Sequence, residues 1–484
     1  MDPQDIYYEA MLARDYRFDG KFYVAVKTTG IYCRPICPAK PKRENVEFFD
    51  NALAAEKAGY RPCLRCHPEF SPEHPTWSGK SQVVQKALQL ISQNVMFEIS
   101  VEELAGQLHV SSRHLRRLFE EEVGLSPKQI SDIHRLNFAN KLIRETNLEL
   151  TQVALASGFE SLRRFNDAFK KRYRLSPREI RKAKGSKTEA VFTLHLSYRP
   201  PFDWGALLQY YASHQIPYLE NVTLDSYERV FGEGGSIGAF TVYNNEKTAQ
   251  LELQIVCQDP KMLFIAVNKV RQMFDLDSDP LLIGNQFSAF PFLNALWEEF
   301  PGLRIASGWD PFQIAIGTIL GQVISITQAS KLMRELVRVY GQPIKHPITG
   351  EPSFLFPTPE RLSEASLNEI KTTAQRKEAI RQLSRALVNK EINFSEIQST
   401  KEIKEQLLKI KGIGSWSAEY ICLRGFGDTD AFPKDDLVLK RALKAVGHHF
   451  DASQIAPWQG YLAVYLWKKF GQVKKEASNG SAIL

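Results

Sequence analysis

Two closely spaced cysteine pairs constrain the fold of this chain more than any other feature of the sequence. Three residues separate Cys33 from Cys37, and two separate Cys63 from Cys66. Each pair can bring two thiolates to one ion, and the four together match the tetrahedral coordination of zinc. The sequence therefore predicts one Zn²⁺ bound by all four cysteines in a small N-terminal domain. A zinc ion that only stabilises such a domain satisfies the same spacing.

The length and the charge of the chain limit its organisation and its partners. A chain of 484 residues exceeds what one hydrophobic core supports, so several domains are expected. Its net charge of +7 is concentrated, because basic residues outnumber acidic ones by eight between Lys80 and Lys187. This concentration favours a nucleic-acid partner, although a solvated helical surface carries similar charge. No apolar run is long enough to span a membrane and no signal peptide is found, so we expect a cytoplasmic protein without a membrane partner.

Proline-rich and polar stretches indicate where domains begin and end. The first lies at residues 71–79 and the second at residues 182–190. A softer boundary between Pro280 and Pro291 separates a strand-rich segment from a helical one. Within the strand-rich segment, Asn244 and Asn245 lie between two alternating runs and are expected to form a hairpin turn.

The basic segment contains an internal repeat. The sequence FEEEVGLSPKQI, which begins at Phe119, returns fifty residues later as FKKRYRLSPREI. Each copy begins within the second helix of a helix-turn-helix pattern, whose inward residues are Leu115 and Phe119 in the first pattern and Phe165 and Phe169 in the second. Basic side chains at the start of the second helix suit phosphates and base edges in the major groove, although helical hairpins also bind proteins. The sequence predicts DNA contacts by Arg113, Arg116, Arg163 and Arg164.

The residues around the cysteines resemble the N-terminal domain of the Ada response proteins, through TTGIYCRPICPAKPKRENVEFF and AGYRPCLRCHP. In that family zinc keeps one thiolate nucleophilic, and this thiolate takes a methyl group from a methylated DNA phosphate. By position the acceptor here is Cys33. Methylation removes a negative charge from the zinc–thiolate centre and so weakens its repulsion from DNA. The flanking residues predicted to hold the phosphate diester are Lys27, Thr29, Arg34 and Lys40.

The paired helix-turn-helix units and the LSPREIR ending resemble the DNA-binding domain of AraC-type activators, over about a hundred residues. The resemblance implies a regulator that binds promoter DNA and responds to methylation, with RNA polymerase as a further partner. Two DNA-reading units already lie in one chain, so no oligomer is required. The alternative is a constitutive, zinc-stabilised DNA anchor or transcription factor in the N-terminal half.

The C-terminal half contains a glycine turn and, shortly after it, an aspartate. Gly412 and Gly414 lie between helical runs, which lets backbone amides approach a DNA phosphate, although a G-x-G also occurs in ordinary tight turns. Asp436, twenty residues after Trp416, opens another helix, where aspartate commonly acts only as an N-cap.

Together these features resemble the helix-hairpin-helix glycosylases, specifically the AlkA type of 3-methyladenine glycosylase. The likeness runs from about Phe192 to Phe470 and includes YRPPFDW, ILGQVIS and PWQGYLAVYLW. It implies hydrolysis of the bond between an alkylated base and deoxyribose, with Asp436 as the catalytic carboxylate. Trp416 stands where strand-nicking relatives have a Schiff-base lysine, so no lyase step is expected.

The same resemblance implies further roles. Val323 would fill the gap left by the flipped base. Electron-rich rings favour a cationic base, although each ring alone is also an ordinary core residue. The rings implied for the pocket are Tyr210, Trp416, Tyr420 and Trp467.

The predicted fold is multidomain and mainly α with α+β parts. We expect a zinc domain at residues 1–75, an all-α double helix-turn-helix domain at residues 81–183, a TATA-binding-protein-like α+β subdomain at residues 190–290 and an all-α helix-hairpin-helix glycosylase domain at residues 291–475. Zn²⁺ is the only cofactor expected. The expected partner is double-stranded DNA, both damaged and promoter, in the bacterial nucleoid.

Overall fold

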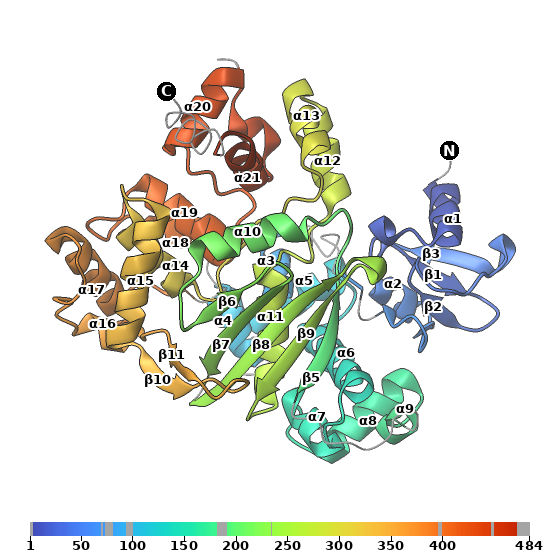
Figure 1. Ribbon diagram of the computed structural model, residues 1–484. Coiled ribbons are helices and arrows are strands. Elements are labelled where there is room, and N and C mark those ends of the chain that lie inside the picture. The colour runs from blue at the N-terminus through green and yellow to red at the C-terminus, as the bar shows by residue number, and fades with distance from the viewer. Residues whose placement is uncertain are drawn as a thin grey trace. The chain divides into compact units, whose positions relative to one another are not determined.

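A computed structural model of the chain describes residues 3–68, 71–72, 81–92, 100–181, 191–233, 235–394, 399–446 and 450–471 (Figure 1). Two units are distinguished. Unit 1 comprises Met1–Pro200, Val242–Asn268 and Leu276–Ser278, and unit 2 comprises Pro201–Thr241, Lys269–Asp275 and Asp279–Leu484. The predicted boundary at residues 182–190 lies outside the described residues. None of the helices described is long and apolar enough to cross a membrane.

The N-terminal part of unit 1 is a four-stranded sheet in the order β3-β1-β2-β4, with a helix on each face. Alternation along β1 explains this arrangement, because Phe22 and Val24 pack with Met11, whereas Tyr23 and Ala25 face the opposite side. β1 pairs antiparallel with β2 and β3, and β2 pairs in parallel with β4. The elements are α1 (Pro3–Ala13), β1 (Tyr23–Val26), β2 (Ile31–Cys33), β3 (Val46–Phe49), α2 (Ala52–Lys57) and β4 (Arg61–Pro62).

The repeat forms two helix-turn-helix units on either side of the long helix α6. The four inward side chains predicted from the repeat are all fully buried, which confirms the two apolar faces. Both turns use a residue with positive φ, His109 at 56° and Gly158 at 76°. The helices are α3 (Gln82–Ser92), α4 (Val101–Gln107), α5 (Ser112–Glu122), α6 (Pro127–Glu145), α7 (Leu150–Ala156), α8 (Leu162–Tyr173) and α9 (Pro177–Arg181).

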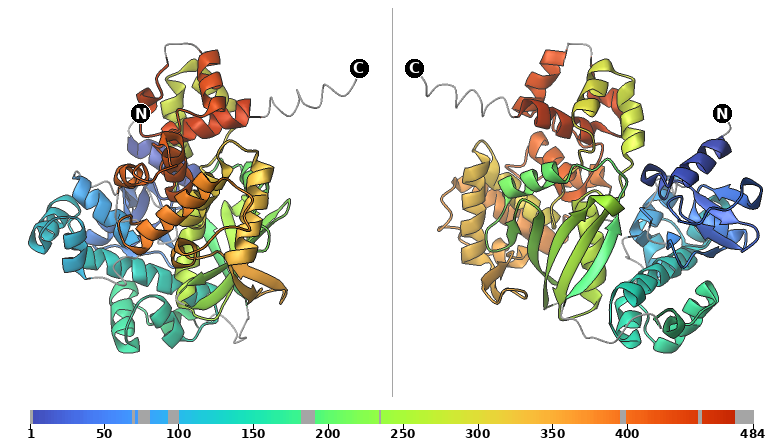
Figure 2. Two further views of the ribbon diagram at one scale, coloured as in Figure 1. Left: turned by 90° about the vertical axis from the view of Figure 1, so that its left-hand side faces the viewer. Right: turned by 45° about the vertical axis from the view of Figure 1, so that its right-hand side comes forward.

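A five-stranded sheet with the order β5-β9-β8-β7-β6 follows in the chain, and Figure 2 shows its strands side by side. β5 and β9 are antiparallel neighbours, as are β6 and β7. The elements of this segment are β5 (Phe192–Ser197), α10 (Trp204–His214), β6 (Glu220–Val222), β7 (Ser226–Glu233), β8 (Ser236–Asn245), β9 (Gln250–Cys257) and α11 (Lys261–Met273).

Two sequence expectations differ from this segment. Asn244 and Asn245 were expected to form the hairpin turn, but they are the last residues of β8. A 3₁₀ turn at Glu246–Thr248 and Ala249, with a φ of 49°, reverse the chain instead. The change from strands to helices also comes before the boundary expected between Pro280 and Pro291, because α11 follows directly after β9.

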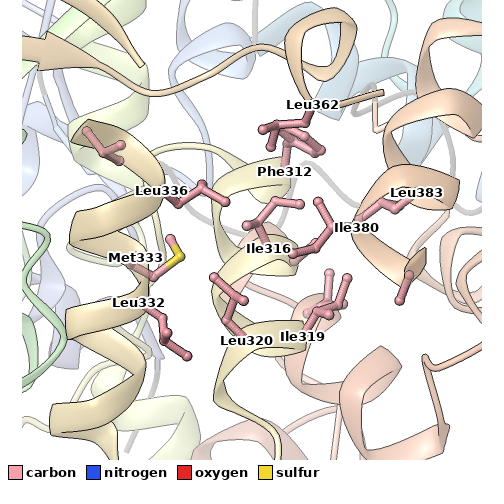
Figure 3. Close-up of a cluster of buried hydrophobic side chains, with 14 of the residues drawn as sticks. Phe312, Ile316, Ile319, Leu320, Leu332, Met333, Leu336, Leu362, Ile380 and Leu383 are labelled. Carbon is pink, nitrogen blue, oxygen red and sulfur yellow. The ribbon is translucent and has the colours of Figure 1, made fainter. Parts of the chain in front are cut away.

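The helical part of unit 2 is built around two buried clusters, one of which is shown in Figure 3. There, Ile316 of α14 and Ile380 of α17 approach each other, with Leu336 of α15 nearby. The bounds are α12 (Pro280–Ser288), α13 (Pro291–Glu299), α14 (Pro311–Gly321), α15 (Ile326–Tyr340), β10 (Gln342–Lys345), β11 (Pro352–Leu355), α16 (Pro359–Ser363), α17 (Ala374–Val388), α18 (Thr400–Leu407), α19 (Ser415–Phe426), α20 (Leu437–Val446) and α21 (Gln459–Phe470).

Candidate active site and metal site

The parallel pairing of β2 and β4 brings the two cysteine pairs together. Cys33 is the last residue of β2, and Cys63 follows β4, where its amide donates to the Tyr32 carbonyl at 3.0 Å. A tight turn returns Cys37 to the site, since its amide donates to the Arg34 carbonyl at 3.1 Å. Local strand pairing and one turn therefore place residues that are thirty positions apart around one point.

The four sulfur atoms form a cluster of the size that zinc requires. All four Sγ atoms lie within 4.8 Å of one another, and Cys33 and Cys37 are buried. Four thiolates at this separation fit a tetrahedral Zn²⁺ with no other ligand. Within the part of the chain that the structure describes, these cysteines form the one cluster able to hold a metal ion.

Backbone amides distinguish Cys33 from the other three cysteines. The Arg34 amide donates to Cys66 Sγ at 3.3 Å, and the Arg65 amide donates to Cys63 Sγ at 3.4 Å. Cys37 accepts from the backbone amide of Ala39. Among the described residues, no backbone N–H donates to the sulfur of Cys33. An N–H···S bond withdraws electron density from a thiolate and lowers its nucleophilicity, and the described backbone makes no such bond to Cys33.

The residues predicted to hold a phosphate diester divide into two groups. Lys27, Thr29 and Lys40 are exposed. Arg34 is only 5% exposed, and its guanidinium forms an ion pair with buried Asp19, with Nε donating to Oδ1 at 2.8 Å. The structure therefore does not present Arg34 to a phosphate, because a buried carboxylate already takes its donors.

The four arginines predicted to contact DNA lie on the exposed faces of α5 and α8. Two of them form exposed ion pairs, Arg116 with Glu102 at 2.5 Å and Arg164 with Glu160 at 3.3 Å. Exposed pairs of this kind contribute little to stability, so these side chains can exchange a carboxylate for a phosphate at small cost.

The glycine turn before α19 leaves the first backbone amides of the helix without a side-chain cap. Gly412 has a φ of 103°, a backbone conformation that residues with a side chain rarely adopt. Gly414 is the N-cap of α19 and provides no side-chain cap, so the first amides of the helix are left open. Gln322 ties the α14–α15 turn to this hairpin, because its Nε2 donates to the Gly412 carbonyl at 2.8 Å. In that turn, Val323 is fully exposed and has a φ of 56°.

Asp436 is held between the ends of two indole rings. Trp467 Nε1 donates to Asp436 Oδ1 at 3.1 Å, and Trp416 Nε1 donates to Oδ2 at 3.3 Å. Oδ1 also accepts the amides of Val438 at 2.9 Å and Leu439 at 3.1 Å, so the carboxylate caps α20 as well. The N-cap role of Asp436 is therefore compatible with a catalytic role, because capping α20 fixes the carboxylate where the two tryptophans donate to it. Asp435, by contrast, is exposed and pairs with Lys440.

The four predicted pocket rings and Asp436 form one cluster. Trp416 and Tyr420 are stacked, with centroids 5.2 Å apart, and Tyr420 meets Trp467 edge-on at 6.1 Å. Tyr210 comes from α10, and its ring lies 4.3 Å from the guanidinium carbon of Arg424. Each of these rings is half-buried. Three helices thus contribute rings to the cluster, and two of those rings, Trp416 and Trp467, contact the carboxylate directly.

Arg424 is the residue that sequence reasoning missed in this cluster. It follows Trp416 and Tyr420 at intervals of four on α19, which places all three on one helix face. That spacing was the available signal. Beside it, burial and, to a smaller extent, the charge of Arg424 lower the pKa of His214 to about 4, so this imidazole is neutral at neutral pH.

The sequence matches four protein families in succession. Residues 6–69 match the metal binding domain of Ada, and residues 104–183 match a helix-turn-helix domain. Residues 193–310 match the AlkA N-terminal domain, and residues 316–454 match the HhH-GPD superfamily of base excision DNA repair proteins.

Three characterised or named relatives resemble different lengths of the chain. A probable bifunctional transcriptional activator/DNA repair enzyme AlkA of Mycobacterium tuberculosis is 33% identical over 95% of both chains. DNA-3-methyladenine glycosylase 2 of Escherichia coli is 26% identical over 58% of this chain and 99% of its own length. The bifunctional transcriptional activator/DNA repair enzyme Ada of E. coli is 43% identical over 25% of this chain and 33% of its own length.

Proposed function

The chain belongs to the family of bifunctional transcriptional activator/DNA repair enzymes, and we propose that it releases alkylated bases from DNA at Asp436 and accepts methyl groups at Cys33. Members of this family act in DNA repair and in transcriptional regulation. The glycosylase and helix-turn-helix parts bind DNA. The division at residues 1–75, 81–183, 190–290 and 291–475 remains a proposal, and the match to the AlkA N-terminal domain continues past residue 290 to residue 310.

The observation that carries the glycosylase proposal is the position of Asp436 between Trp416 and Trp467. In the proposed reaction, the bond between C1′ and the base nitrogen breaks and its electron pair leaves with the base. Water adds to C1′, and its proton passes to solvent. The Asp436 carboxylate stabilises the cationic sugar, and the two indole N–H groups keep the carboxylate in place.

The hairpin and the turn at Val323 supply the DNA contacts that this reaction needs. The open amides at the start of α19 bind a phosphate near the damaged nucleotide. Val323 fills the space that the extruded base leaves, and the Gln322 hydrogen bond to Gly412 holds it at a fixed distance from the hairpin. The hydrolytic, 3-methyladenine type of activity is accordingly proposed without a lyase step.

Replacing Trp467 with phenylalanine tests the link between the indole and the carboxylate. The variant keeps an aromatic ring but loses the N–H donor to Asp436 Oδ1, so base release is expected to fall by about tenfold, the scale of one lost hydrogen bond to a charged group. Release of 3-methyladenine from methylated DNA, quantified by chromatography, measures the effect. Trp458→Phe is the matched control, because its ring packs on Tyr461, outside the cluster. Equal rates for W467F and the native protein would contradict the assigned role.

The second proposed activity is methyl transfer from a methylphosphotriester to Cys33, supported by the missing N–H···S bond at that sulfur. The thiolate attacks the methyl carbon, and the DNA phosphate leaves with the electron pair and becomes a diester anion. The sulfur of Cys33 becomes a thioether, and the four-cysteine site, which would hold Zn²⁺, has one negative charge fewer. We propose that this loss strengthens promoter binding by α5 and α8, with RNA polymerase as the partner that the bound activator contacts.

One zinc ion per chain is expected from the four-cysteine cluster. Elemental analysis of the purified protein should give one equivalent of zinc, and a strong chelator should abolish the near-UV signal of the tyrosines that pack beside β1. Base release should persist after chelation, because Asp436 and its ring cluster lie in unit 2. A zinc-free protein with an unchanged spectrum would contradict the metal assignment.

A further inference from the structure

Arg424 is a buried cation for which the described residues provide no carboxylate partner. Its side chain is 5% exposed, and Nη1 donates to the Ala306 carbonyl at 2.9 Å. Among the described residues, its Nε has no hydrogen-bond acceptor, and the ion pairs of this part of the chain do not include it. Burying a guanidinium in this way is costly, so a site that contains one needs a compensating interaction.

Two rings of the cluster provide part of that compensation. The guanidinium carbon lies 4.3 Å from the centroid of Tyr210 and 5.3 Å from that of Trp467. These distances are within the range of cation–π attraction. Trp467 therefore contacts a charge at each of two places, with Asp436 at its N–H and Arg424 over its ring. The ring cluster contains a fixed negative charge and a fixed positive charge joined through one indole.

We propose that Arg424 promotes departure of the base, because it holds a positive charge against Tyr210 and Trp467, two of the rings proposed to receive the base. The proposal rests on the glycosylase function proposed above. When the bond between C1′ and the base nitrogen breaks, the base gains an electron pair and the sugar becomes cationic. Asp436 stabilises the sugar, and Arg424 stabilises the base as its electron density rises.

The formal charge of the base distinguishes the effect of Arg424 on substrate binding from its effect on the reaction rate. A neutral base leaves as an anion, which is then protonated by water, whereas an alkylated cationic base leaves neutral. In both cases the base becomes more negative by one unit, so Arg424 accelerates both reactions. Before the bond breaks, however, Arg424 repels a cationic base and does not repel a neutral one. The residue thus sets the relative binding of charged and uncharged lesions.

Single-turnover kinetics with two duplex oligonucleotides test this role, one containing cationic 7-methylguanine and the other neutral hypoxanthine. Arg424→Gln keeps a donor for the Ala306 carbonyl but removes the charge. The maximal rate should fall by about tenfold on both duplexes, the scale of one charge in a partly dry site. The half-saturating enzyme concentration should fall severalfold for 7-methylguanine and stay unchanged for hypoxanthine. Arg424→Lys, which keeps the charge, should retain most of the native rate.

A merely structural role gives a different pattern. Loss of rate in both variants, with no charge-dependent change in half-saturation, overturns the proposal, as does R424Q with native rates. If R424Q shows no thermal unfolding transition, R424K decides alone: a native rate supports the proposal, and a tenfold loss in a folded protein overturns it. If the native protein releases only 7-methylguanine, that duplex decides. A lower maximal rate together with a lower half-saturating enzyme concentration in R424Q supports the proposal, and any other pattern overturns it. If the folded native protein releases neither base, methylated DNA replaces the two duplexes and the release of 3-methyladenine, which is also cationic, is measured instead. Failure to release 3-methyladenine as well refutes the glycosylase function itself, independently of Arg424.

Discussion

Asp436→Asn is expected to reduce base release by a hundredfold or more, about the loss seen when one electrostatic stabiliser of a transition state is removed. The amide keeps an oxygen that can cap α20, since asparagine is as good an N-cap as aspartate, so the fold should persist. The variant loses the charge that stabilises the cationic sugar, and it also loses the hydrogen bond from Trp416 Nε1, which an amide nitrogen cannot accept. Release of 3-methyladenine from methylated DNA at saturating enzyme measures the change.

The neighbouring residue gives a matched control for that experiment. Asp435→Asn changes an exposed carboxylate that pairs with Lys440 and touches neither tryptophan, so its rate should stay within about twofold of the native rate. Full activity in D436N, or equal losses in D435N and D436N, would show that the carboxylate between the indoles does not perform the chemistry.

Cys33→Ala is expected to abolish methyl uptake. After incubation with DNA that carries methylphosphotriesters, the native protein should gain one methyl group on the peptide containing Cys33, and the variant should gain none. The reason is that, of the four clustered cysteines, Cys33 is the one to which no described backbone N–H donates. Peptide mass spectrometry measures the transfer. Cys257→Ala is the control, since this half-buried thiol lies outside the zinc cluster.

Base release provides the second reading of the Cys33 experiment. C33A should release 3-methyladenine at the native rate, because Asp436 and its rings do not involve the zinc centre. A methyl group found on Cys37, Cys63 or Cys66 of the native protein would contradict the assignment of the acceptor.

The features that the sequence revealed best are those set by local spacing. The cysteine pairs and the inward faces of the repeat depend on neighbours a few residues away, and the metal cluster and the buried Leu115 and Phe165 were predicted from them. The family resemblance brought Asp436 together with the rings. Spacing alone could not, since Tyr210 comes from a helix some two hundred residues earlier in the chain.

The expectations that failed depend on distant partners. Arg34 looked like a phosphate contact because it stands beside Cys33, but Asp19, which the sequence gives no reason to pair with it, takes its donors. Arg424 was overlooked because an arginine on a helix is ordinarily solvated. Its burial follows from Tyr210 and Trp467, which tertiary packing brings to it. The turn expected at Asn244 and Asn245 lies further along the chain, because β8 continues through both residues.

The central claim is that one chain carries two separable chemistries, and one reaction tests it most directly. Native protein, D436N and C33A are each incubated with methylated duplex DNA, and the same sample is analysed for free 3-methyladenine and for a methyl group on Cys33. We predict both products for the native protein, methyl transfer alone for D436N and base release alone for C33A. The claim would be contradicted if either folded variant lost both products. It would also be contradicted if both variants kept base release and methyl transfer alike.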